Sequence, residues 1–298
     1  MNARSLALAG SLVAVSALPA VAQEDFSAVE IKAEKVADGI YMLTGSGGNL
    51  GLSVGEDGAY LIDDQYAPLT GKILAAVKEL TAKPVRFVVN THYHGDHTGG
   101  NENMGEAGAL LVAHENVRRR MATGTFMEAF NRQVEPAPAA ALPVVTFSDA
   151  VSFHWNGEEI RAFFVGPAHT DGDSIIHFVK ADVFHMGDTL FNGMYPFIDV
   201  SAGGRIDGMI TAADRVLKVA GDTTRLIPGH GPLATKADLQ AYRDMLAQVR
   251  DRVAKLKAEG KTAEQIVAAK PTADLDEKWG GGFMEPDNWV GLVIESMK

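Results

Sequence analysis

Residues 91–97 read Thr-His-Tyr-His-Gly-Asp-His, which places three imidazoles and one carboxylate within six residues. An apolar run at residues 85–89 comes before them and predicts a buried strand. Residues 98–101, Thr-Gly-Gly-Asn, follow and predict a turn that can open a helix. These polar side chains therefore fall where a strand ends, which is where α/β sheets usually bind ligands.

The spacing of these side chains determines which of them can bind the same metal ion. Residues two apart in extended backbone point the same way, so His92 and His94 can bind one metal ion. Gly95 tolerates positive φ and lets the chain bend, which turns Asp96 and His97 toward a second position. Imidazole and carboxylate ligands together suit zinc, with iron or manganese as alternatives. The stretch predicts a metal centre rather than a polar loop with chance histidines.

The pattern His-x-His-x-Asp-His resembles the signature of the metallo-β-lactamase superfamily. Three later segments resemble the remaining motifs of that family in the right order: residues 166–170 (Gly-Pro-Ala-His-Thr), residues 185–191 (His-Met-Gly-Asp-Thr-Leu-Phe) and residues 228–231 (Pro-Gly-His-Gly). The match spans roughly residues 36–231. The resemblance implies an α/β fold, namely a four-layer αββα sandwich of two mixed β-sheets with helices on the outer faces.

The resemblance also implies a site for two zinc ions. Its ligands would be His92, His94 and His169 for the first ion and Asp96, His97 and His230 for the second, with Asp188 bridging both. Asp96 would also orient the metal-bound hydroxide that attacks a carbonyl carbon. Asp63, at the end of an expected strand, would support the metal-binding loop from outside. A turn or capping role is the alternative for Asp63.

Four side chains are candidates for substrate contacts. Residues 115–134 are expected to form a mainly helical stretch that carries Arg118, Phe126 and Phe130. Arg118 could clamp a substrate carboxylate, because a guanidinium binds carboxylates bidentately, while a solvated helix face with salt bridges is the alternative. Phe126 and Phe130 could form an apolar lid over the site or belong to the core. Arg205 is the second candidate cation.

Residues 1–22 resemble a secretory signal peptide, with a positively charged start, an apolar run at residues 6–18 and a small-x-small cleavage site at residues 20–22. The apolar run is too short for a comfortable membrane span, and an uncleaved anchor is the alternative. We expect the cleaved protein to be exported, to the periplasm. Residues 23–298 are expected to form a single domain with a helical C-terminal extension from about residue 236.

Composition limits the partners. The formal net charge of −11 argues against binding to nucleic acid or to an anionic membrane surface. We expect the substrate to be a small molecule. The chain has no cysteine, so it has neither disulfides nor a thiolate nucleophile nor a cysteine zinc ligand. The sequence leaves the oligomeric state open.

A metal-dependent hydrolase is the function that these features favour, and export would bring it to where β-lactams act. Hydrolysis of the β-lactam ring, a cyclic amide, is therefore the first expectation. The known exported β-lactamases of the family carry Cys or Ser in place of Asp188, and one large group carries a Lys in place of Phe191. Asp188 is more similar to the glyoxalase II and lactonase branches, so a lactone, ester or thioester hydrolase is the alternative. An iron-dependent redox relative and a non-catalytic metal-binding protein are remoter alternatives.

Overall fold

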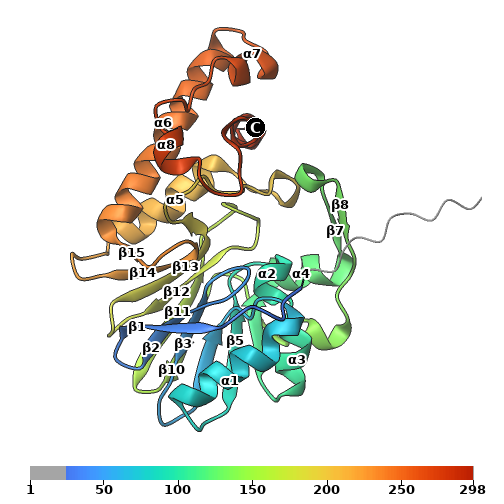
Figure 1. The fold of residues 1–298 in the computed structure, drawn as a ribbon, viewed down its shortest axis with the longest axis vertical. Coiled ribbons are helices and arrows are strands. Elements are labelled where there is room, and N and C mark those ends of the chain that lie inside the picture. The colour runs from blue at the N-terminus through green and yellow to red at the C-terminus, as the bar shows by residue number, and fades with distance from the viewer. Residues whose placement is uncertain (1–24, 298) are drawn as a thin grey trace, which may run out of the picture.

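The structure is a computed structural model that describes residues 25–297. Two β-sheets face each other, and helices cover the outer face of each (Figure 1). The four-layer αββα sandwich expected from the sequence is confirmed. The signal peptide expected at residues 1–22 lies outside the described residues and remains a prediction.

The first sheet has the strand order β1-β2-β3-β4-β5-β6-β9. Its strands are β1 (Lys32–Ala37), β2 (Ile40–Thr44), β3 (Leu50–Ser53), β4 (Ala59–Ile62), β5 (Val85–Asn90), β6 (Leu110–His114) and β9 (Val145–Phe147). The strands β1 to β4 form an antiparallel meander, whereas β4, β5, β6 and β9 run parallel. Parallel strands need crossover connections, and α1 (Thr70–Leu80) and α3 (Asn101–Glu106) supply two of them.

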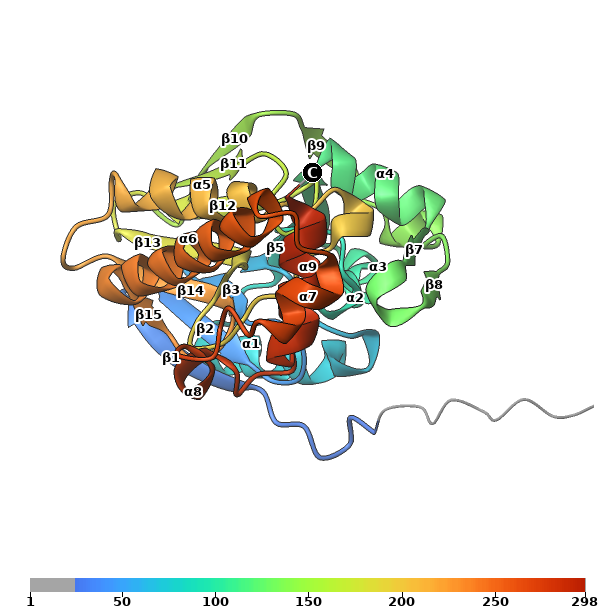
Figure 2. The same ribbon diagram turned by 90° about the horizontal axis from the view of Figure 1, so that it is seen from above.

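The second sheet has the strand order β10-β11-β12-β13-β14-β15. Its strands are β10 (Ala150–Trp155), β11 (Glu158–Phe164), β12 (Ser174–Phe178), β13 (Val183–Phe191), β14 (Arg225–His230) and β15 (Ala234–Thr235). Only the pair β13–β14 is parallel, and its crossover contains α5 (Ile206–Leu217). α5 lies with α6 (Lys236–Ala258) on the outer face of this sheet (Figures 1 and 2).

Strand β4 contributes side chains to two apolar layers, one on each face of the first sheet. Tyr60 and Ile62 point between the sheets, where Tyr60 meets Phe178 of the second sheet at a ring-centroid distance of 6.5 Å. Leu61 points the other way and packs with Ile73 of α1. Successive strand side chains face opposite sides, and both faces of this sheet are covered, so the strand is apolar throughout.

The C-terminal segment adds helices above the second sheet. A capping box between Thr235 and Asp238 begins α6, and α7 (Ala263–Ala268), α8 (Asp276–Trp279) and α9 (Pro286–Ser296) follow. Trp289 of α9 is fully buried and stacks on Tyr195 at a centroid distance of 4.2 Å. Within residues 25–297, the helices all lack the length and apolarity needed to cross a bilayer.

The expectation of a mainly helical stretch over residues 115–134 is wrong beyond its first part. α4 (Glu115–Thr123) stops at Gly124, whose φ of 68° is unfavourable for other residues and where a Cβ would lie 2.5 Å from a backbone oxygen. A β-hairpin follows, made of β7 (Thr125–Met127), a 3₁₀ turn at Glu128–Phe130 and β8 (Arg132–Val134). The hairpin projects beside α4 at one side of the molecule (Figure 2).

The strand that carries Asp188 is irregular. β13 runs from Val183 to Phe191, so Asp188 lies within the strand rather than after it. Gly187 adopts a φ of 50° and shifts the register, and pairing with β14 resumes between Phe191 and His230. This irregular continuation brings Asp188 and His230 to the same edge of the second sheet.

Candidate metal centre

Seven side chains of metal-ligand type converge where strands of the two sheets end. They are His92 and His94 from the loop after β5, Asp96 and His97 from the short helix α2 (Gly95–Thr98), His169 from the loop after β11, Asp188 from β13 and His230 from β14. They form two groups, and the ligand atoms within each group lie within 4.8 Å of one another. The structure thus brings together every residue predicted as a metal ligand.

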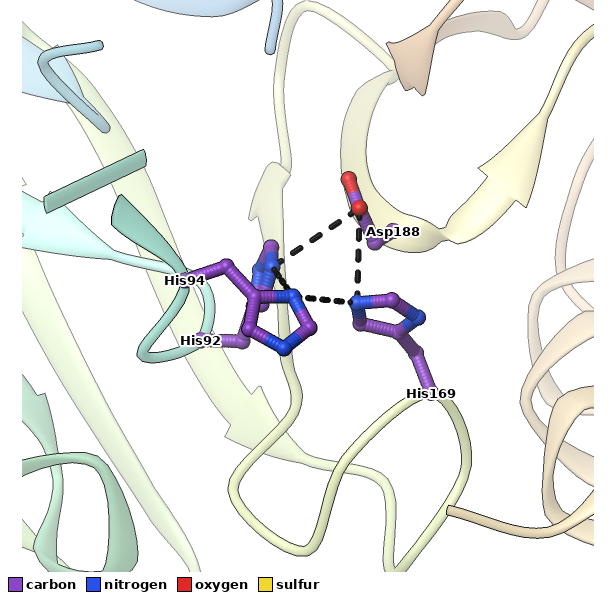
Figure 3. A group of neighbouring side chains, drawn as sticks. All are labelled: His92, His94, His169 and Asp188. Carbon is purple, nitrogen blue, oxygen red and sulfur yellow. Dashed lines mark hydrogen bonds and ion pairs between the residues drawn. The ribbon is translucent and has the colours of Figure 1, made fainter. Parts of the chain in front are cut away.

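The first group is buried and consists of His92, His94, His169 and Asp188 (Figure 3). His94 Nδ1 lies 3.1 Å from Nε2 of His92 and 2.8 Å from Nε2 of His169. Asp188 Oδ2 lies 3.4 Å from Nε2 of His169 and 3.7 Å from Nε2 of His92. Around a tetrahedral zinc ion with metal–nitrogen distances of about 2.0–2.1 Å, ligand atoms stand about 3.3 Å apart, so these spacings fit one ion.

The second group consists of Asp96, His97 and His230. Asp96 Oδ2 lies 3.6 Å from Nε2 of His97 and 3.4 Å from Nε2 of His230. Asp188 reaches this group too, because its Oδ1 lies 3.0 Å from His97 Nε2 and its Oδ2 lies 3.4 Å from His230 Nε2. Asp188 is thus a carboxylate whose oxygens reach histidines of both groups.

Two atoms at this junction test whether a metal fits. His97 Nε2 and Asp188 Oδ1 are buried and face each other at 3.0 Å, yet neither makes a hydrogen bond. Leaving a buried polar atom unpaired costs about 1–3 kcal/mol, and more for a charged one. A cation that accepts both atoms as ligands removes this cost, and a set of imidazoles and carboxylates is what zinc binds. The residues fit a metal centre.

Asp63 fixes the loop that carries the first ligands. This carboxylate has no exposed surface; it accepts hydrogen bonds from the Thr91 backbone N–H at 2.7 Å and from the Thr91 hydroxyl at 2.8 Å. Its Oδ2 also lies 2.7 Å from His97 Nδ1, which directs Nε2 of that ring toward the centre. Such contacts orient a metal-binding imidazole and raise its basicity. The structure places Asp63 where the sequence predicted a supporting carboxylate.

Asp199 orients the ring of His94 as Asp63 orients that of His97. This role was not predicted from the sequence. Asp199 Oδ2 lies 2.9 Å from His94 Nε2 and accepts a 2.5 Å hydrogen bond from the Tyr93 hydroxyl. Its other oxygen accepts hydrogen bonds from Ser201 and from the Ala202 backbone. Because Nε2 of His94 is engaged by Asp199, Nδ1 is the nitrogen that faces the centre. The only signal in the sequence was a lone acid directly after an aromatic and apolar stretch.

The charges of the centre favour an anionic Asp188. Burial alone would raise the pKa of its carboxyl, but His97 and His230, followed by the other imidazoles, hold that pKa well below its usual value. Burial lowers the pKa of His169 to about 4, so its ring is neutral and free to act as a ligand at pH 7. Burial likewise holds the pKa of His92 well below its usual value.

A cavity of about 480 Å³ opens above the second group. Aromatic side chains form much of its wall: Tyr66, Tyr93, Phe130, Phe191, Phe197 and Phe283. The Phe130 ring stands 4.9 Å from that of Phe197, so the hairpin touches the main body at this wall. Arg132 is the one lysine or arginine among the described residues that line the cavity, and the sequence reasoning did not single it out.

The other predicted substrate contacts lie elsewhere. Phe126 is absent from the cavity wall, because strand alternation turns it to the opposite face of the hairpin from its neighbour Met127. Arg118 donates to the carbonyl oxygen of Pro143 rather than facing the cavity. Arg205 precedes α5 and also lies outside the cavity wall. Of the four candidates, Phe130 alone lines the cavity.

The loop between β2 and β3 closes the cavity from the side of the first sheet. Its Ser46 and Gly47 line the cavity. The side-chain amide of Asn49 donates to the carbonyl oxygens of Pro228 at 3.0 Å and Gly231 at 2.8 Å. The loop is therefore tied directly to the segment that carries the last histidine ligand.

Comparison with known proteins agrees with this geometry. Residues 43–235 match the family model described as the metallo-beta-lactamase superfamily. A metallo-beta-lactamase type 2 from Bacillus cereus is 23% identical over 190 residues, which cover 63% of this chain and 69% of that protein. A hydroxyacylglutathione hydrolase from Gloeobacter violaceus is 32% identical over 123 residues, which cover 41% of this chain and only 40% of that protein.

Solved structures show the same fold. A metallo-beta-lactamase from Pontibacter korlensis superimposes with a TM-score of 0.61 at 20% identity, covering 73% of this chain and 99% of that one. The DIM-1 metallo-beta-lactamase superimposes with a TM-score of 0.59 at 18% identity, covering 74% of this chain and 98% of that one. By its motifs, its fold and the match of its sequence, the chain belongs to the metallo-β-lactamase superfamily, a superfamily of metal-dependent hydrolases.

Proposed function

We propose that the protein is a zinc-dependent hydrolase that opens β-lactam rings. The observation that carries this proposal is the convergence of seven ligand-type side chains at the base of an aromatic cavity. A cavity of about 480 Å³ lies in the range of small-molecule sites. The relative from Bacillus cereus and both structural neighbours carry the name metallo-beta-lactamase, which favours the β-lactam ring over other acyl groups.

Two zinc ions would be held by the two groups of ligands, with Asp188 shared between them. When bound, zinc polarises a carbonyl oxygen and lowers the pKa of water to about 7. Asp96 lies partly exposed at the base of the cavity, with its carboxylate between His97 and His230. Burial opposes ionisation of Asp96, but the two histidines lower its pKa to about 2. This carboxylate stays ionised at neutral pH and can accept a hydrogen bond from the attacking water.

A lactone, ester or thioester hydrolase is the second candidate. Asp188 favours it, because the exported β-lactamases of the family carry Cys or Ser at that position. The relative from Gloeobacter violaceus is named for a thioester substrate and has the higher identity, although the match covers less than half of that protein. The cavity wall suits either class of apolar acyl compound.

Steady-state kinetics on five substrates would decide between the two candidates: a penicillin, a cephalosporin, a carbapenem, a homoserine lactone and a glutathione thioester. We expect kcat/KM above about 10⁴ M⁻¹s⁻¹ on at least one β-lactam. Asp96→Asn should lower kcat by about 10²–10⁴-fold, because it removes the charged oxygen that would bind the second ion and orient the attacking water. Slow turnover of every β-lactam together with fast turnover of the lactone or thioester would reject the first candidate in favour of the second.

We also propose export to the periplasm with removal of residues 1–22. The support is the pattern of that segment: a positive start, an apolar run and a small-x-small cleavage site. N-terminal sequencing of protein recovered from the native cell envelope should give Gln23 as the first residue. Recovery of an intact Met1, or of protein in the cytosol alone, would reject the proposal.

A further inference from the structure

We propose that Arg132 and Phe130 of the β7–β8 hairpin form a binding site for a single carboxylate carried on an apolar body. The inference deepens the proposed function and rests on it in one respect, since it concerns the same cavity. It names the substrate class: acyl compounds with one negative charge beside an aromatic or aliphatic group. Neither residue belongs to the two groups of metal ligands or to the sequence motifs quoted above.

The hairpin register decides which of its side chains enter the cavity. Met127 pairs with Arg132 and Thr125 pairs with Val134, and directly opposed residues of an antiparallel pair lie on one face. Met127, Arg132 and Val134 all line the cavity. The alternate pair, Phe126 and Gln133, falls on the other face. Arg132 thus enters the cavity because of the pairing of the hairpin, rather than as a surface side chain that happens to be near.

The guanidinium of Arg132 is available to a ligand. Within residues 25–297, no hydrogen bond, ion pair or cation–π contact engages this side chain, and it is exposed. Arg119 and Arg120, on the helix that leads into the hairpin, are by contrast paired with Asp171. A free guanidinium presents a planar fork of donors that matches a carboxylate bidentately. The guanidinium of Arg132 therefore favours an anion that offers two oxygens, such as a carboxylate.

Aromatic rings that line the cavity together with Arg132 indicate that the rest of the ligand is apolar. Phe130 and Phe283 are 48% and 58% exposed and both line the cavity, so they present an apolar surface to a ligand that contacts Arg132. Phe197 backs Phe130 at 4.9 Å and is itself buried. The Phe197 carbonyl oxygen also lies 2.8 Å from Nδ1 of His169. Phe197 therefore connects the apolar wall both to the metal ligand His169 and to Phe130 of the hairpin.

The neighbouring surface limits the ligand to one negative charge. A second hollow adjoins the cavity, shares Phe130 and Phe283 with it, and continues to α9. Its lining includes the carboxylates of Glu128, Glu285 and Glu295 and contains no lysine or arginine among the described residues. A second carboxylate that extended past Phe283 would meet like charges. The arrangement favours monoanions over dianions.

Binding of 4-phenylbutyrate and of its neutral counterpart 4-phenylbutyramide tests the inference without any turnover. Calorimetry on the metal-loaded protein should show that Arg132→Gln weakens phenylbutyrate binding by about tenfold or more, the usual loss for a charge-assisted hydrogen bond. Binding of the amide should change less than about twofold, because it lacks the charge. Arg132→Lys should lose less than Arg132→Gln, since it keeps the charge but not the fork.

Arg225→Gln is the matched control, because Arg225 is exposed at the opposite end of β14 from His230. It should leave both affinities unchanged. Equal loss of the acid and the amide, or no loss of the acid, in Arg132→Gln would overturn the inference. Loss of phenylbutyrate binding without any β-lactam turnover would reject only the proposed function. β-lactam turnover with unaltered phenylbutyrate binding would reject only this inference.

Discussion

Gly48 lies so close to the imidazole of His97 that a Cβ at this position would stand 2.1 Å from Cε1 and 2.4 Å from Nε2 of that ring. The φ of Gly48 is not positive, so space alone, and not backbone conformation, requires glycine here. The contact joins the loop of the first sheet to a metal ligand. This close contact explains why the β2–β3 loop has a glycine at the point where it covers the centre.

Gly48→Ala should therefore displace His97 and weaken metal binding by about tenfold or more, the loss that follows when a metal ligand is misoriented. Gly71→Ala is the control, since nothing lies within 4 Å of a Cβ at that helix position. The control should leave the zinc affinity unchanged, because the added methyl group meets no other atom. Titration with a chromophoric zinc chelator measures the affinity, and equal affinities in the two variants would contradict the packing argument.

Asp199→Asn tests whether Asp199 orients His94. The substitution keeps the size of the side chain but removes the charge that holds His94 Nε2 at 2.9 Å. We expect zinc affinity to fall by about 10–100-fold. Tyr93→Phe removes only the hydroxyl that donates to Asp199, so its loss should be smaller. The two chelator titrations would contradict the account if Tyr93→Phe lost more affinity than Asp199→Asn.

The sequence predicted which seven side chains come together, because each of them sits in a short local motif. Arg132 was not predictable in this way. Its role depends on Gly124 ending α4 and on two strands of three residues, which are too short to show an alternating pattern. Asp199 has no motif of its own, and its contact with His94 spans 105 residues of sequence. Side chains placed by packing between distant segments are the ones that local patterns miss.

The two groups of ligands should differ in their proton release. Burial opposes the charge of His230, but Asp188 and then Asp96 raise its pKa to about 9, and carboxylates likewise raise the pKa of His97. These rings are protonated at pH 7.5 without metal and must lose their protons to bind it. His169, with a pKa of about 4, is already neutral. Binding at the second group should therefore strengthen as the pH rises from 7 to 9, whereas binding at the first should hardly change.

Calorimetric zinc titrations in two buffers of different ionisation enthalpy measure this proton release. One binding event should release protons at pH 7.5 and the other close to none. Equal proton release in both events would contradict the difference in protonation between the two groups.

Removal of metal should destabilise the fold, because it leaves a cluster of buried imidazoles and carboxylates without their partner. Zinc at about a thousand times its Kd contributes about 4 kcal/mol to the free energy of unfolding. For a chain of this size, each kcal/mol shifts Tm by roughly 2–4 °C, so EDTA should lower Tm by about 8 °C or more. Scanning calorimetry with EDTA, followed by excess zinc, measures the shift. A Tm that does not move with EDTA would mean that the cluster is stable without metal.

The zinc content of the wild-type protein and of Asp188→Ala, measured by mass spectrometry after reconstitution and desalting, tests the central claim most directly. The claim is that the two groups hold one ion each and share Asp188. The account predicts about two zinc ions in the wild type and about one or fewer in Asp188→Ala, with turnover lost in parallel. Asp222→Ala, at an exposed carboxylate away from the centre, should keep both ions. A wild type that binds one ion or none, or an Asp188→Ala variant with full zinc content and full rate, would contradict it.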